Sequence, residues 1–178
     1  MLRQILACGV MFACFTTVGR GDDAAAAAKV PPPHPGLERM KKLAGTWVEA
    51  DKDGKATDKV VSIVKVTANG SVVHETLFPG QPQEMVSIYN LDKGDLVMTH
   101  YCSLGNQPRM KADPKSPKDK IHFAFAGGTN LDPAKDMHMH EGTITFVDDD
   151  HIEFAGVAWV DGKPSESHCG QLKLVRKK

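Results

Sequence analysis

From Gly45 to the C-terminus the hydrophobic pattern has a period of two, and this alternation constrains the fold more than any other feature. Such a period is typical of β-strands that bury one face. The turn-forming pairs Asn69-Gly70, Lys93-Gly94 and Asp161-Gly162 lie between successive runs and predict tight connections. We therefore expect strands in the segment 60–66 and over the ranges 71–78, 84–91, 95–104, 121–126, 138–147, 151–160 and 166–175.

Two stretches depart from this alternation. Apolar residues at helical spacing from Leu37 to Ala44 predict one short amphipathic helix over 37–44, which Gly45 ends. The range 105–118 is polar and contains three prolines, so we expect a long loop there. Short strands at regular spacing with Gly and Asp turns predict a sandwich or a barrel. We expect an antiparallel β-barrel of about eight to ten strands, closed at one end by the helix.

The first residues predict export. Arg3 precedes an apolar run from Ile5 to Val18, which is shorter than the roughly 20 residues of a membrane-spanning helix. We interpret residues 1–19 as a signal peptide that is cleaved somewhere between 19 and 28, leaving no transmembrane segment in the mature chain. The expected location is the periplasm or the exterior. An alternative is lipid attachment at Cys14, although the residues before it match a lipoprotein signal poorly.

Composition constrains the domain organisation and the partners of the chain. Residues 20–36 are rich in alanine and proline and predict a tether, followed by one folded domain at 37–178. The chain has 22 basic and 22 acidic side chains, so no positive excess favours binding to nucleic acid. Cys102 and Cys169 remain after cleavage, and they are either a disulfide or two free thiols.

The order of a short helix, then Gly45-Thr46-Trp47, then an antiparallel meander resembles the lipocalin and fatty-acid-binding-protein superfamily. The resemblance implies a lipocalin-like barrel in which a basic residue of the last strand packs over the tryptophan, and Arg176 is placed for that role. The stretches 74–80, 99–102 and 106–110 are also similar to an exported bacterial family of unassigned function with such barrels. The threonine-aspartate-tyrosine motif of lipocalins has no clear counterpart.

Strand alternation predicts which side chains face the barrel interior. Histidines are unusually frequent among them, and His74 is a further candidate if it faces inward with Val72, Thr76 and Phe78. Imidazoles inside a barrel need hydrogen-bond partners, water or a ligand. The residues expected to face inward are Met98, His100, Cys102 and Leu104 on 95–104, His138, His140, Ile144 and Phe146 on 138–147, and His168, Leu172 and Leu174 on 166–175.

Two hypotheses follow for these histidines. His138 and His140 at i and i+2 on one face could converge on zinc or another transition metal, with His100 and His168 or Cys102 completing the site; haem is a related alternative. The other hypothesis is a polar lumen whose histidines bind no metal. Neither a zinc-protease motif, nor a nucleophile elbow, nor a phosphate loop occurs in the sequence.

Our leading prediction is an exported protein that binds a small hydrophobic or amphipathic molecule inside the barrel. The residues predicted to bind it are Met98, His100, Cys102, Leu104, Arg109, Ile144, Phe146 and Leu172, with Leu174 adding to the apolar lining. The alternatives are a metalloprotein, or an enzyme, that uses the histidines, and a structural envelope protein with a packed barrel. No oxyanion donor accompanies Cys102, so we do not expect catalysis from that thiol.

Overall fold

The computed structural model describes residues 33–178, without the side chains of Glu166, His168 and Cys169. The predicted signal peptide and most of the predicted tether lie outside this range. Within it, one short helix precedes ten strands, in agreement with the predicted all-β fold. The elements are α1 (Pro35–Lys41), β1 (Gly45–Ala50), β2 (Ala56–Thr67), β3 (Val72–Leu77), β4 (Met85–Asp92), β5 (Asp95–Tyr101), β6 (Gln107–Ala112), β7 (Lys120–Thr129), β8 (His138–Phe146), β9 (His151–Val160) and β10 (Lys163–Arg176).

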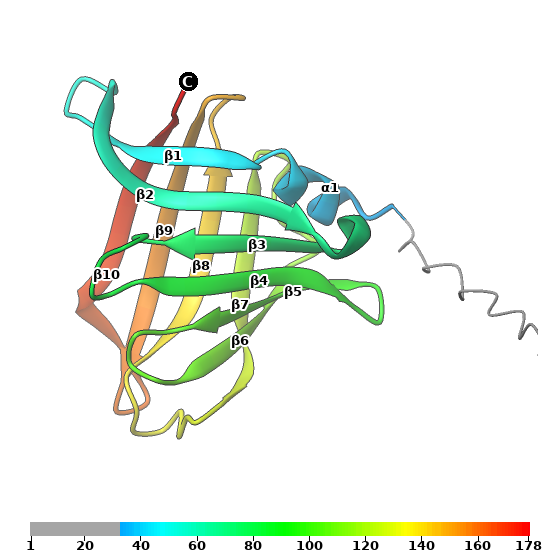
Figure 1. The fold of residues 1–178 in the computed structure, drawn as a ribbon. Coiled ribbons are helices and arrows are strands. Elements are labelled where there is room, and N and C mark those ends of the chain that lie inside the picture. Colours follow the sequence, from blue (N-terminus) through cyan, green and yellow to red (C-terminus); the bar gives the residue numbers. More distant parts are fainter. Residues whose placement is uncertain (1–32) are drawn as a thin grey trace, which may run out of the picture.

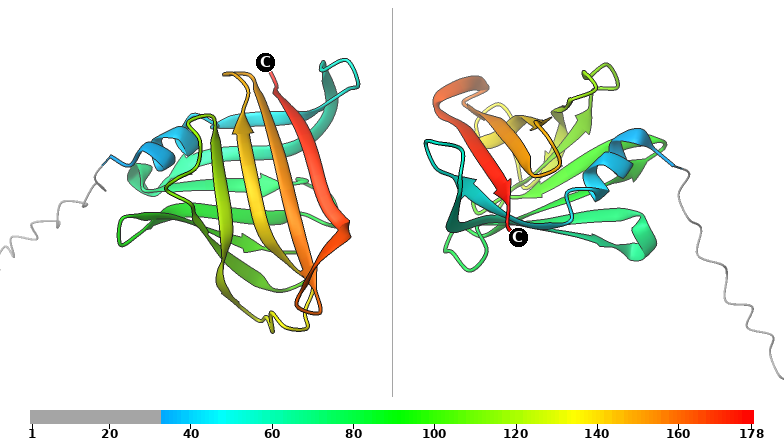
Figure 2. Two further views of the ribbon diagram at one scale, coloured as in Figure 1. Left: turned by 180° about the vertical axis from the view of Figure 1, so that it is seen from behind. Right: turned by 90° about the horizontal axis from the view of Figure 1, so that it is seen from above.

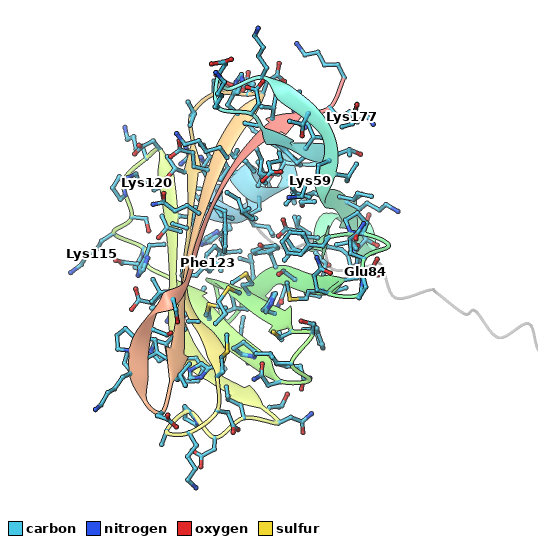
Figure 3. The ribbon with its side chains drawn as sticks, turned by 90° about the vertical axis from the view of Figure 1, so that its left-hand side faces the viewer. Lys59, Glu84, Lys115, Lys120, Phe123 and Lys177 are labelled. Atoms are coloured by element: carbon cyan, nitrogen blue, oxygen red, sulfur yellow. The ribbon has the colours of Figure 1, made fainter. Side chains whose placement is uncertain are left out.

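The strands form one closed antiparallel barrel in which every strand pairs with its neighbours in sequence (Figure 1). Pairing of β1 with β10 completes the ring, so the described sheet has no free edge. The views in Figure 2 show the strands surrounding a common interior, with α1 at one end. Charged side chains labelled in Figure 3, such as Lys115 and Lys177, extend away from the barrel.

Helix α1 begins and ends earlier than the predicted 37–44. Pro35 occupies its first turn, where the missing N–H costs nothing, and Nδ1 of His34 accepts a hydrogen bond from the Leu37 N–H at 3.3 Å. Beyond Lys41 the backbone N–H groups of residues 42–44 donate to carbonyls three residues back, so the chain tightens and the α-helix ends. Leu37 and Met40 are buried against the barrel.

The predicted tight turns occur at Lys93-Gly94 and Asp161-Gly162. In each pair both residues have positive φ, and the flanking residues pair directly, as in a two-residue hairpin. The Asn69-Gly70 connection is longer than predicted. A 3₁₀ turn spans Ala68–Gly70, and Thr67 pairs with Val72 across it.

The prediction of a continuous loop over 105–118 is wrong, because β6 (Gln107–Ala112) lies within it. Met110 of this strand is fully buried and pairs with Met98 of β5. The prolines that obscured the strand do not prevent pairing. Pro108 lies beside a register shift in the β6–β7 ladder, where a strand tolerates a residue without an N–H donor.

Candidate ligand-binding cavity

A cavity of about 330 Å³ lies inside the barrel, and we call it the lumen cavity. Most of its wall is apolar. Met40 and Leu43, from α1 and the turn that follows it, contribute to the wall, in keeping with the predicted role of the helix at that end. Strands β2 to β5 and β8 to β10 supply much of the remainder, including Leu77 of β3, Ile144 of β8 and Phe154 of β9.

Most of the residues predicted to bind a ligand are part of this wall. They are Met98, His100, Cys102, Leu104, Ile144 and Leu172, and Leu174 lies with them. Phe146 and Arg109 are not part of it. Arg39 covers the ring of Phe146 with its guanidinium carbon 4.0 Å from the ring centre, and Arg109 is paired with Asp92 at 2.6 Å between Nη2 and Oδ2.

A stripe of polar side chains crosses the apolar wall on three adjacent strands. Glu75 of β3 pairs in register with Ser87 of β4, which pairs with His100 of β5, so the three side chains share one face. The hydroxyl of Ser87 lies 3.0 Å from Nδ1 of His100, and both residues are almost fully buried. All three line the lumen cavity.

Glu75 is the acceptor at the centre of a second set of hydrogen bonds. Tyr89 donates its hydroxyl to Oε2 and Ser62 donates to Oε1, each at 2.6 Å. Tyr89 and Ser62 are almost fully buried. The carboxylate is therefore held in one position by two short hydrogen bonds from protected donors.

Burial decides the charge of two further groups in the wall. It lowers the pKa of His100 from 6.5 to about 4, so that imidazole is neutral at pH 7. Burial, followed by the negative charge of Glu75, raises the pKa of Tyr89 well above 10, so the phenol keeps its proton. Both side chains therefore offer uncharged hydrogen-bonding groups to the lumen cavity.

Glu75, Ser87 and Tyr89 were not among the predicted site residues, and His74 does not meet the condition of facing inward that would have made it one. In β3 the inward face carries Val73, Glu75 and Leu77, and His74 lies on the other face and is not part of the lumen cavity. Both faces of this strand carry apolar residues, so alternation alone could not choose between them. On the next strand, Met85, Ser87 and Tyr89 alternate along one face. That alternation was the signal available in the sequence for an inward face that includes Ser87 and Tyr89.

Contrary to the prediction from alternation, His138 and His140 do not both face the lumen cavity. The register shift between Met139 and Glu141 breaks the alternation, and His138 and Met139 line the lumen cavity whereas His140 does not. Nε2 of His138 lies 2.9 Å from Nδ1 of His140, and Nδ1 of His138 lies 2.8 Å from the carbonyl oxygen of Asp136.

The ring of His140 lies between two aromatic rings. It stacks on Trp159 with the ring centres 3.7 Å apart, and on Phe125 with the centres 4.6 Å apart. Burial, followed by the neighbouring His138, lowers the pKa of His140. The ring of His140 is therefore held by stacking on two aromatic rings and by its hydrogen bond to His138.

Among the described side chains, no three His, Cys, Asp or Glu residues are close enough together to hold a metal ion. His100 is bonded to Ser87, and the other two described histidines of the predicted site are bonded to each other. The side chains of His168 and Cys169 lie outside the described residues, and Cys102 is a free thiol.

A second depression, of about 590 Å³, lies outside the barrel between α1 and the segment that precedes β7. Its wall mixes charged side chains, such as Lys42, Asp113 and Lys118, with prolines. We consider the lumen cavity the better candidate despite its smaller volume, because strands surround it and its wall is mostly apolar.

The described chain is thus an antiparallel barrel of ten strands with an internal cavity, consistent with a calycin-like barrel. Comparison with protein-family models and with curated proteins finds no match for the chain. No helix within residues 33–178 is long and apolar enough to cross a membrane.

Proposed function

We propose that this protein is an exported carrier that binds a small, mostly apolar molecule in the lumen cavity. The observation that carries the proposal is the cavity itself. Its volume of about 330 Å³ and its apolar wall with a few convergent polar groups are typical of small-molecule sites. Export is proposed from the apolar run 5–18, which resembles a signal peptide.

The composition of the wall favours binding over a purely structural barrel. Methionine is frequent in it, with Met40, Met85, Met98, Met137 and Met139 all taking part. Methionine side chains are flexible and polarisable, and they adapt to ligands of different shape. A barrel that served only to pack would be filled by side chains, as small barrels are.

We further propose remote kinship with the lipocalin and fatty-acid-binding-protein superfamily. The support is the arrangement around Trp47, in the Gly45-Thr46-Trp47 motif. The guanidinium of Arg176, from the last strand, covers the Trp47 ring, and the indole N–H donates to the carbonyl of Leu43 at 2.8 Å. This is the contact that the sequence resemblance implied.

Two variants on one strand test whether the lumen cavity binds ligands. Leu172→Trp places a larger side chain in the cavity, and Lys173→Trp places the same side chain on the exposed face of β10. The probe is the neutral fluorophore N-phenylnaphthylamine, titrated into each purified protein. We expect Leu172→Trp to weaken binding about tenfold or more, because the new indole occupies the site, and Lys173→Trp to leave it unchanged.

Circular dichroism shows whether both variants keep the barrel. Equal probe binding by the wild type and Leu172→Trp would place the probe outside the lumen cavity and contradict the proposal. Solvent extraction of the untreated protein, followed by mass spectrometry, is the complementary measurement. It is expected to release a small organic molecule that Leu172→Trp does not retain.

A further inference from the structure

Among the described residues, the lumen cavity is lined by one acidic side chain, that of Glu75, and by no lysine or arginine. Its other titratable members are Tyr89, His100, Cys102 and His138. Tyr89 and His100 are neutral at pH 7 for the reasons given above. Both ring nitrogens of His138 are already engaged, by Asp136 and His140.

Glu75 lacks a positive partner within the described residues. It makes no ion pair there, and its two hydrogen bonds come from the neutral hydroxyls of Ser62 and Tyr89. A carboxylate has about four lone-pair positions, so roughly two remain available. Because Glu75 also lines the lumen cavity, a molecule bound there lies beside this residue.

A negative charge in apolar surroundings is costly unless an opposite charge accompanies it. The described residues supply hydrogen bonds to Glu75 but no counter-charge, so a cationic ligand would stabilise the site. A carboxylate ligand such as a fatty acid would instead be repelled by Glu75 and would find no arginine or lysine among the described residues of the wall.

The geometry points to a cavity that selects molecules with an apolar body and a protonated amino group, with Glu75 as the counter-ion. The ammonium group would donate to the free positions of Glu75, and the Ser87 hydroxyl beside it is a second acceptor. The apolar body would lie against the methionines of the wall. This inference rests on the proposed carrier function and names its ligand class.

The test compares three probes of equal chain length, decylamine, decanol and decanoate, by isothermal titration calorimetry at neutral pH with the full chain. The wild type is expected to bind decylamine about tenfold or more tightly than decanoate, with decanol between them. This ranking needs no variant, so it holds as a test whatever the effect of a substitution on folding.

Glu75→Gln removes the charge and nearly preserves the shape. We expect it to abolish the preference for decylamine over decanol. Glu153→Gln is the matched control, since it removes an equivalent charge from the partly exposed Glu153 side chain on β9, which pairs with Lys173. The control is expected to retain the wild-type ranking. Thermal melting monitored by circular dichroism verifies that each variant is folded.

The outcomes separate this inference from the proposed function. If decanol binds but decylamine binds no more tightly than decanoate, the carrier function stands and the amine preference is wrong. A preference that persists in folded Glu75→Gln would also overturn the role of Glu75. If none of the three probes binds, the proposed carrier function itself fails.

Discussion

The guanidinium carbon of Arg176 lies 4.4 Å from the centre of the Trp47 ring, and the two residues pair directly across β1 and β10. Arg176 also donates from Nη1 to the carbonyl of Ala44 and from Nη2 to that of Lys42, at 2.8 and 2.9 Å. One side chain therefore joins the last strand, the first strand and the segment after the helix. It stabilises the pairing that closes the barrel.

We expect Arg176→Ala to lower the free energy of unfolding by about 2 to 4 kcal/mol, since charged hydrogen bonds and a cation–π contact are lost together. Lys177→Ala removes a neighbouring exposed cation and should change stability by less than about 0.5 kcal/mol. Urea unfolding followed by circular dichroism measures both. Equal stability of the two variants would mean that Arg176 does not stabilise barrel closure.

Much of this fold could be predicted because its signals are local. Lys93-Gly94 and Asp161-Gly162 are the residue pairs that a two-residue hairpin with positive φ requires. The inward face of β5 was also correct, since Leu96, Met98 and His100 are buried there. Pairing of Trp47 with Arg176 came from the resemblance rather than from local pattern.

The errors arise where a long-range contact overrides the local pattern. The register shift at His140 depends on how β8 pairs with β9, and alternation within β8 alone cannot reveal it. Strand β6 is held in place by the burial of Met110 against β5 and β7. This burial outweighs the loss of an N–H donor at Pro108. The role proposed for Glu75 was hidden because an acid is unexpected on a strand face that also carries Val73 and Leu77.

The buried His100 makes a pH-dependent contribution to stability. Its pKa is about 4 in the folded protein and 6.5 when unfolded, so between these values the unfolded state binds the extra proton. The free energy of unfolding should therefore fall as the pH drops from about 6.5 to about 4, by about 3 kcal/mol in total from this group. Urea unfolding at a series of pH values measures it.

Two variants isolate this contribution. His100→Asn removes the titrating group, so its stability advantage over the wild type should grow, or its deficit shrink, as the pH falls. Ser87→Ala removes the hydrogen-bond partner but keeps the buried imidazole, and burial is the cause of the shift. It should therefore retain the wild-type pH slope. A slope unchanged in His100→Asn would assign the acid sensitivity to other groups.

His138 is fully buried, and both of its ring nitrogens have partners. His138→Ala leaves a void and leaves the Asp136 carbonyl and the His140 ring without their partner, so we expect a loss of about 2 to 4 kcal/mol. His122 is half-buried, and among the described residues its ring bonds Thr143 alone, so His122→Ala should cost about 1 kcal/mol. Denaturant midpoints compare the two variants. Equal losses would mean that the hydrogen-bonded pair of His138 and His140 has no special structural importance.

The register shift between β6 and β7 makes a separate prediction about Gly128. A Cβ atom added there would lie 2.8 Å from the carbonyl oxygen of Gln107 and 3.1 Å from Cα of Pro108, and both of these are backbone atoms. The chain would have to move, so Gly128→Ala should destabilise the protein by about 1 to 3 kcal/mol. Gly170→Ala, where a Cβ meets nothing within 4 Å, should leave stability nearly unchanged. Thermal melting of both variants decides the matter: equal melting temperatures would mean that β6 does not approach β7 as closely as described.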